Sequence, residues 1–161
     1  MDITLIEAFG NSTAVVDNLN NLLTFGSNSH GQLGLDQHLK PASFDNCHNS
    51  LQRINKSLIN LTIVQLYGAG NTFGFLTKQN QVFICGEFAP PIDKIKAEAK
   101  GNQQVIPKGA LGILGSKYSQ NLLKPTQAKF LEDPKQRFKI KKFALTHTSV
   151  ALIANDASGV S

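Results

Sequence analysis

A segment near the start of this sequence recurs later in the chain with the same pattern. Residues 3–26 superpose on residues 63–86 without a gap, and the match is one of pattern rather than identity. The matched pairs are Ile6 and Leu66, Gly10 and Gly70, Asn11 and Asn71, Val16 and Leu76, Asn20 and Asn80, Leu22 and Val82, Leu23 and Phe83, and Gly26 and Gly86. Self-similarity at a fixed spacing is the sequence signature of repeat architectures. We therefore expect a stack of similar units, each covering the apolar face of the next.

Beyond Gly26 the spacing grows by insertion. The stretch Gly31-Gln32-Leu33-Gly34 recurs as Gly109-Ala110-Leu111-Gly112, at a larger shift than the segments before it. A third copy begins near Phe138, with Ala151 aligned on Phe75 and Leu152 aligned on Leu76. The predicted units are repeat 1 at about 1–61, repeat 2 at about 62–137 with an insertion at 87–108, and a partial repeat 3 at about 138–161.

Each unit is predicted to contain short strands. Segments 3–9, 13–16 and 22–25 are four to seven residues long and rich in β-branched or aromatic residues. We expect Asn20 and Asn80 at hairpin turns, because Asn tolerates the left-handed backbone that such turns demand. Segments 22–25 and 82–85 are apolar at nearly every position, which indicates that both faces are covered. Small sheets stacked about an axis satisfy this pattern, so the prediction is an all-β chain with the architecture of a β-propeller.

Two spacers are predicted to form short helical insertions. Leu51, Ile54 and Leu58 stand at helical spacing after Ser50, which predicts an amphipathic helix within 50–61. The insertion 87–108 has prolines near its start and Gly101 after a charged stretch, as an exposed helix would. Binding often resides in extra loops on a rigid scaffold, and an inert insert is the alternative. The candidate partner-binding residues are Asp93, Lys94, Lys96, Glu98 and Lys100 in the insertion, and Asn28 and His30 in the loop 27–38.

The charge is unevenly distributed along the chain. The net charge is +5, yet residues 1–39 contain no Lys or Arg. The densest basic run consists of Lys135, Arg137, Lys139, Lys141 and Lys142. Such a run can follow phosphates or an acidic surface, but we favour a solvated strand edge, which lysines commonly protect from pairing. Only two of the 16 basic residues are Arg, which weakens the case for base recognition and makes nucleic acid an unexpected partner.

Catalytic and cofactor motifs are missing from the sequence. It contains no Gly-x-Ser-x-Gly, no His-Glu-x-x-His and no Gly-Lys-Ser/Thr phosphate loop, so we expect neither an enzyme nor a cofactor. The His and Cys residues stand at spacings unrelated to those of metal ligands, and no metal site is expected; they are His30, His38, Cys47, His48 and His147.

Compartment signals favour an intracellular protein. Cys47 and Cys85 lie far apart without a Cys-x-x-Cys spacing, which predicts two reduced thiols. No apolar run approaches the roughly 20 residues of a membrane span. Met1 is followed by Asp2 rather than by a basic signal-peptide start. We expect a cytoplasmic or nuclear protein that does not contact membranes.

Residues 22–34, Leu-Leu-Thr-Phe-Gly-Ser-Asn-Ser-His-Gly-Gln-Leu-Gly, resemble the regulator of chromosome condensation repeat, in which a strand ends in Trp-Gly and is followed by Asn and then Gly-Gln-Leu-Gly. In that family the repeat, of about 50 residues, builds a propeller of seven blades. The resemblance implies an incomplete β-propeller of about two and a half antiparallel blades with short helical insertions. Glycine allows positive φ or close backbone approach at the junctions between blades. The repeat glycines are Gly26, Gly31, Gly34, Gly86, Gly109 and Gly112.

The chain departs from the family pattern at several positions. It contains no Trp, and Phe25 and Cys85 stand in that place. The family's His before the second strand is replaced by Ser12, Thr72 and Thr148, and Asn20 and Asn80 stand where the family has a turn Gly after that strand. An unclosed stack exposes a whole blade face. We therefore expect a fragment, self-association, or pairing with further blades from a partner.

The resemblance favours a non-catalytic protein–protein interaction module, with another protein as the partner. The alternatives are guanine-nucleotide exchange on a Ran-like small GTPase, which the founding member performs, and chromatin-associated binding. The sequence has no recognisable match to the family's exchange loop.

Overall fold

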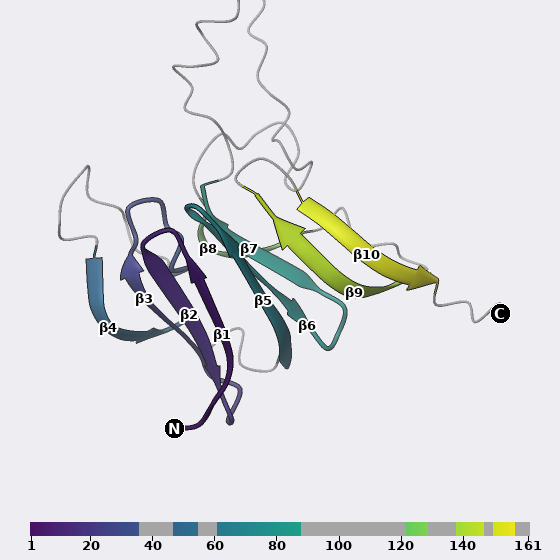
Figure 1. The fold of residues 1–161 in the computed structure, drawn as a ribbon, viewed down its shortest axis with the longest axis horizontal. Helices are drawn as coiled ribbons and strands as arrows, with labels where there is room; N and C mark the ends of the chain where they lie inside the picture. Colours follow the sequence, from purple (N-terminus) through teal and green to yellow (C-terminus); the bar gives the residue numbers. More distant parts are fainter. Residues whose placement is uncertain (36–46, 55–60, 88–121, 129–137, 147–149, 157–161) are drawn as a thin grey trace, which may run out of the picture.

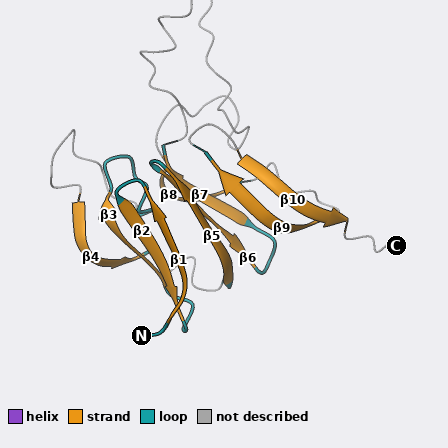
Figure 2. Cartoon of the chain, in the orientation of Figure 1, coloured by secondary structure: helices purple, strands orange, loops and turns teal. Residues whose placement is uncertain are grey.

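The computed structural model describes residues 1–35, 47–54, 61–87, 122–128, 138–146 and 150–156. This part of the chain forms ten strands and no helix (Figures 1 and 2). The strands are β1 (Ile3–Phe9), β2 (Ser12–Asp17), β3 (Leu22–Ser27), β4 (Cys47–Arg53), β5 (Ile63–Ala69), β6 (Thr72–Thr77), β7 (Val82–Gly86), β8 (Leu122–Gln127), β9 (Phe138–Leu145) and β10 (Val150–Asp156). Within these ranges there is consequently no helix long and apolar enough to cross a membrane.

The strands form three antiparallel sheets in which consecutive strands are neighbours. The first sheet has the order β1-β2-β3-β4, the second β5-β6-β7-β8, and the third β10-β9. Contacts link β1 to β5 and β5 to β9, and the sheets fan out from these three first strands (Figure 1). This is the arrangement of successive blades in a β-propeller.

The pairing register repeats between the sheets. Ile6 pairs with Val15 in the first sheet, Leu66 with Phe75 in the second, and Phe143 with Leu152 in the third. Leu152 is therefore the counterpart of Phe75 rather than of Leu76, and the register predicted for the third unit is wrong by one residue. Ala151, Leu152 and Ile153 are all apolar, so the sequence alone does not distinguish alignments that differ by one residue. Strand pairing does, because it places Leu152 beside Phe143.

The hairpin turns after β2 and β6 have the conformation predicted for them. Asn20 and Asn80 have φ values of 61° and 64°. The backbone N–H of Asn20 donates to the carbonyl oxygen of Asp17 at 2.9 Å, and that of Asn80 donates to the carbonyl oxygen of Thr77 at 3.0 Å. The left-handed backbone expected from Asn at these positions is confirmed.

Apolar side chains fill both spaces between the sheets. Phe9 and Phe73 stack across the first space with ring centroids 5.0 Å apart. Tyr67 and Phe143 meet across the second with centroids 6.0 Å apart. All five residues of β7 are buried, so the prediction that both faces are covered is confirmed for residues 82–85. In residues 22–25 it is confirmed for one face only, because Leu23 and Phe25 on the other face are partly exposed. Burial of each such aromatic side chain contributes about 1.5–3 kcal/mol, so these contacts hold the sheets together.

The helix predicted within 50–61 is wrong over its first four residues. Residues 50–53 belong to β4, where Gln52 pairs with Thr24 and Arg53 pairs with Leu23. The edge of β3 offers unpaired backbone groups, and pairing with that edge overrides the weak helical spacing. Ile54 then enters the core between the first two sheets. Leu58 and the helix expected in 87–108 beyond Glu87 lie outside the described residues.

Candidate interaction site at the loop end

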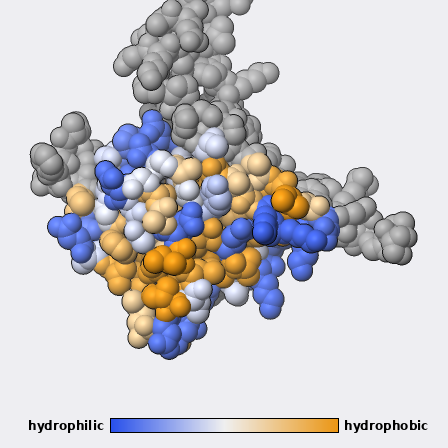
Figure 3. All heavy atoms as spheres, in the orientation of Figure 1, coloured by the Kyte–Doolittle hydropathy of each residue, from blue (hydrophilic) through white to orange (hydrophobic). Residues whose placement is uncertain are grey.

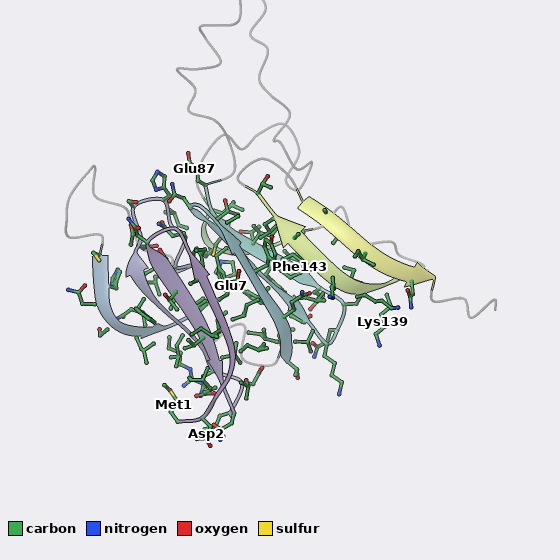
Figure 4. The ribbon with its side chains drawn as sticks, viewed as in Figure 1. Met1, Asp2, Glu7, Glu87, Lys139 and Phe143 are labelled. Carbon is green, nitrogen blue, oxygen red and sulfur yellow. The ribbon has the colours of Figure 1, made fainter. Side chains whose placement is uncertain are left out.

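One end of the first two sheets gathers the turns and loops that the sequence singles out. The turns at Gly10 and Gly70 are adjacent, because a Cβ on Gly10 would overlap the carbonyl oxygen of Gly70. His30 and Glu87 meet at the same end, with 3.5 Å between Nε2 and Oε2. We call this end, comprising both turns, residues 28–35 and Glu87, the loop end. In Figure 4 Glu87 lies there, opposite Met1 and Asp2.

The loop after β3 is held by its own side chains. The Oδ1 atom of Asn28 accepts a hydrogen bond from the backbone N–H of Leu33 at 3.0 Å. The Oε1 atom of Gln32 accepts one from the N–H of His30 at 2.8 Å. The hydroxyl of Thr24 donates to the carbonyl oxygen of Leu33 at 3.0 Å. Asn28 and Gln32 are buried, so they shape the loop, whereas the His30 side chain is only half-buried.

Two glycines let this loop pack on the second sheet. Gly31 and Gly34 have φ values of 78° and 69°, in the left-handed region that favours glycine. A Cβ on Gly31 would lie 2.8 Å from a methyl carbon of Leu123, and one on Gly34 would lie 3.0 Å from Pro125. Both neighbours belong to β8, so the loop of the first sheet fits directly against the last strand of the second. Positive φ is also found at Gly26 and Gly86, as expected for repeat glycines, while Gly109 and Gly112 lie outside the described residues.

Glu87 anchors the point where the chain leaves the second sheet. The side-chain amide of Asn71 donates to its Oε2 at 2.9 Å, and the backbone N–H of Glu87 donates to the carbonyl oxygen of Asn71 at 3.0 Å. The His30 ring approaches the same Oε2 and is itself 2.9 Å from the Ser29 hydroxyl through Nδ1. Glu87 is thus a shared partner of both sheets.

The predicted insertion begins beside the loop after β3. Glu87 is its first residue and contacts His30, and β8, where the described chain resumes, begins at Leu122. The carbonyl oxygen of Leu122 would lie 3.1 Å from a Cβ on Gly31. The first residue of the insertion therefore lies against the loop after β3, which is the other candidate binding segment. The insertion residues Asp93, Lys94, Lys96, Glu98 and Lys100 lie outside the described residues.

The described lysines of the basic run, all on β9, lie away from the loop end. Lys139, Lys141 and Lys142 are exposed on β9, and Figure 4 shows Lys139 far from Glu87. A β-bulge between the pairs Lys142–Ile153 and Ile140–Ala154 leaves Lys141 without a partner on β10. The extra residue lets Ile140 and Phe143 both face the core, while the lysines face solvent. Lys135 and Arg137 lie outside the described residues.

The two cysteines have different environments. Both are free, with Cys47 exposed and Cys85 buried. Burial raises the pKa of the Cys85 thiol, because the thiolate would lose its hydration. Its Sγ lies 3.4 Å from the carbonyl oxygen of Gln32, so it helps to seat the loop after β3. Across the described ranges, no group of three His, Cys, Asp or Glu residues is placed to hold a metal ion.

Sequence reasoning did not single out Glu87 as part of a site. Its neighbour Gly86 carries the repeat signal, and Glu87 looks like the start of an insertion. The sequence feature that could have pointed to Glu87 is the repeated Asn at positions 11 and 71. In the structure the side-chain amide of Asn71 donates to Glu87. An Asn at the turn before the second strand of each of these two units marks this end of the sheet.

Solved structures with a similar fold include two that share little sequence with this chain. Human WBSCR16 has a TM-score of 0.62 and 12% identity, over 94% of this chain and 30% of that protein. Yeast RCC1 (Prp20), solved bound to Kap60, has a TM-score of 0.59 and 16% identity, over 94% of this chain and 30% of that protein. The fold is an incomplete β-propeller, similar to the folds of these two proteins. The chain thus spans about a third of these proteins, and at such identities the likeness shows the fold. No protein-family model and no curated protein matches the sequence.

Proposed function

We propose that this chain is a non-catalytic protein-interaction module whose partner contacts the loop end. The observation that carries the proposal is the contact between His30 and Glu87. It joins the loop 27–38 to the insertion 87–108, the two segments that the sequence nominates for binding. A partner protein would span both segments, with His30 at one side and Asp93, Lys94, Lys96, Glu98 and Lys100 at the other. Asn28 is buried, so it would shape the loop rather than touch the partner.

The construction of the loop supports this role. The hydrogen bonds of Asn28 and Gln32 fix the backbone of 28–34, so the loop would lose little conformational entropy on binding. Ser29 is exposed and His30 half-buried, so both present polar atoms at the surface. Rigid scaffolds that carry exposed loops are the usual arrangement for protein recognition.

The second candidate function is guanine-nucleotide exchange on a Ran-like small GTPase. It rests on the fold shared with yeast RCC1, a protein solved in complex with a protein partner. Exchange requires a surface that prefers the nucleotide-free GTPase to the loaded one. Chromatin-associated binding through Lys139, Lys141 and Lys142 is a third candidate. We favour the interaction module because it needs only the loop end, which is formed by the first two sheets.

Deletion of residues 88–108 tests the proposal while keeping Glu87 and its hydrogen bonds. We expect the shortened chain to unfold at the same urea concentration as the wild type and to lose the partner in a pull-down. His30→Ala should reduce recovery, while Gln79→Ala, an exposed substitution at the opposite end, should leave it unchanged. Full recovery with the deletion would remove the insertion from the proposed site.

Two assays separate the candidates. A nucleotide-release assay on a loaded Ran-like GTPase should show no acceleration if the chain is a binding module alone. Binding to DNA or RNA through the lysines would weaken steeply as salt is raised. In this proposal the protein resides in the cytoplasm or nucleus, a reducing setting that suits the free thiols of Cys47 and Cys85.

A further inference from the structure

The first sheet has a second face, directed away from the second sheet. Pairing places Ile6, Val15 and Leu23 in one row and Ala8, Thr13 and Phe25 in another row on the same side. We call this side the β1 face. The opposite side carries Leu5, Phe9, Val16 and Leu22, which form the core with the second sheet.

The matching face of the second sheet is covered by the first sheet. Leu66 occupies the place of Ile6, because Leu66 pairs with Phe75 as Ile6 pairs with Val15. The exposed fraction is 7% for Leu66 and 68% for Ile6. Ile3 is likewise exposed where its counterpart Ile63 is buried. The repeat thus identifies what fits the β1 face, namely the far side of another blade.

The third sheet carries such a far side at the other end of the stack. Ile153 pairs with Lys142, and Ala151 pairs with Ala144. The two pairs form neighbouring rows on the same side of the β9–β10 sheet. By the repeat register, Ile153 is the counterpart of Leu76 and Val16. Those two residues are 3% and 2% exposed because the next sheet covers them, whereas Ile153 is 60% exposed.

Each of the two interfaces inside the chain brings a residue equivalent to Ile153 against a residue equivalent to Ile6. Val16 and Leu66 belong to one core cluster, and Leu76 and Phe143 belong to the other. A contact between Ile153 of one copy and Ile6 of another would repeat the same relation a third time. We infer that the chain associates head to tail, with the β9–β10 end of one copy on the β1 face of the next.

The chain itself carries both surfaces, which supports a second copy as the occupant. In Figure 3 hydrophobic residues gather over β1 and hydrophilic residues over β9. The register favours this pairing over one between two β1 faces, because both interfaces inside the chain join the face of one sheet that carries its first-strand Leu66 or Phe143 to the far side of the sheet before it. A head-to-tail contact is heterologous, so copies add to both ends until a ring closes or a filament grows.

Sedimentation equilibrium of the full chain tests this inference. The wild type should show a weight-average mass that rises with concentration above the chain mass of 17.5 kDa. Ile6→Lys blocks one surface and Ile153→Lys blocks the other, and each variant alone should stay at the chain mass. Leu19→Lys is the matched control, because Leu19 is an exposed apolar turn residue outside both surfaces, and this variant should associate like the wild type. All three positions are exposed, so equal urea midpoints should confirm that the fold is kept.

Mixing the two blocked variants gives the decisive result. The Ile6→Lys chain keeps its β9–β10 end and the Ile153→Lys chain keeps its β1 face, so an equimolar mixture should form a complex of twice the chain mass and nothing larger. Dimers of the Ile153→Lys variant alone would overturn the head-to-tail arrangement in favour of paired β1 faces. A wild type that remains at the chain mass at every concentration would overturn self-association altogether. Neither result depends on the partner bound at the loop end.

Discussion

The side chain of Asn20 joins the first sheet to the backbone of Ile63 in the second. Its Oδ1 accepts a hydrogen bond from the Ile63 N–H at 2.9 Å, and its Nδ2 donates to the carbonyl oxygen of Leu61 at 2.6 Å. Asn80 makes the corresponding link between the second and third sheets, because its Oδ1 accepts a hydrogen bond from the Ile140 N–H at 2.7 Å. This explains why Asn stands where the family resemblance predicts a turn Gly, because Asn tolerates the left-handed turn and also links one sheet to the next.

Substitution of Asn20 separates these two roles. Asn20→Gly keeps the backbone conformation and removes both side-chain hydrogen bonds, so we expect a loss of about 1–3 kcal/mol in the free energy of unfolding. Asn20→Ala should lose about 1–2 kcal/mol more, because it also places a Cβ in the left-handed region. Urea denaturation measures both losses. A Gly variant as stable as the wild type would show that the joint contributes nothing.

Gly68 makes room for the ring of Phe9. A Cβ on Gly68 would lie 2.5 Å from the Phe9 side chain, which is fixed by stacking on Phe73. Gly68→Ala should therefore destabilise the protein by about 1–3 kcal/mol through overpacking. Phe9→Ala should relieve part of that cost because it removes Cγ and Cδ1, so the double variant should be more stable than the sum of the two single losses predicts. Strict additivity would mean that the two residues do not meet.

The cysteines should differ in reactivity. Cys85 is buried and its pKa is raised, so it holds little thiolate at neutral pH, while Cys47 is exposed. A chromogenic disulfide reagent should label one thiol per chain in the folded protein and two in urea. Cys47→Ser should abolish the fast reaction. Rapid labelling of Cys85 in buffer would indicate that the first two sheets separate readily.

Asp17 should make stability depend on pH in the acid range. The side-chain amide of Asn21 lowers the pKa of the Asp17 carboxyl below 3.8, and the backbone N–H groups of Asn21 and Leu19 and the charge of Arg53 act in the same direction, while burial opposes them. The unfolded chain therefore takes up the proton first as pH falls. The stability that this carboxylate contributes is present above about pH 4 and is lost as pH drops through its folded pKa.

Comparison with Asp17→Asn isolates that contribution. The wild type should be more stable than the variant at pH 6, and the difference should shrink toward pH 3 when both are unfolded in urea. Other carboxyl groups affect both proteins alike and cancel in the difference. If the difference in free energy of unfolding between the wild type and Asp17→Asn stays constant with pH, the charge of the Asp17 carboxylate does not contribute to stability.

The repeated strands could be predicted because their cause is local. Apolar segments of fixed length and turn-forming Asn residues specify a hairpin wherever they occur, as at Asn20 and Asn80. The positive φ values of Gly26 and Gly86 follow from the same repeated pattern. These features recur at one spacing, so each copy supports the assignment of the other.

The remaining features depend on contacts distant in sequence. Residues 50–53 pair with β3, and periodicity alone suggested a helix because it takes no account of an open strand edge. The register of the third unit is set by the pairing of Leu152 with Phe143. Glu87 joins the candidate site through His30, which stands in the preceding unit and has no repeat signal of its own.

Nuclear Overhauser effects between the first two sheets test the central claim most directly, namely that the repeated sheets pack face to face as neighbouring blades. We expect cross-peaks from the Phe9 ring to the Phe73 ring and to the Gly68 α-protons, together with those expected within each sheet. Cross-peaks within both sheets without any between Phe9 and Phe73 or Gly68 would contradict it, since the units would then fold without stacking.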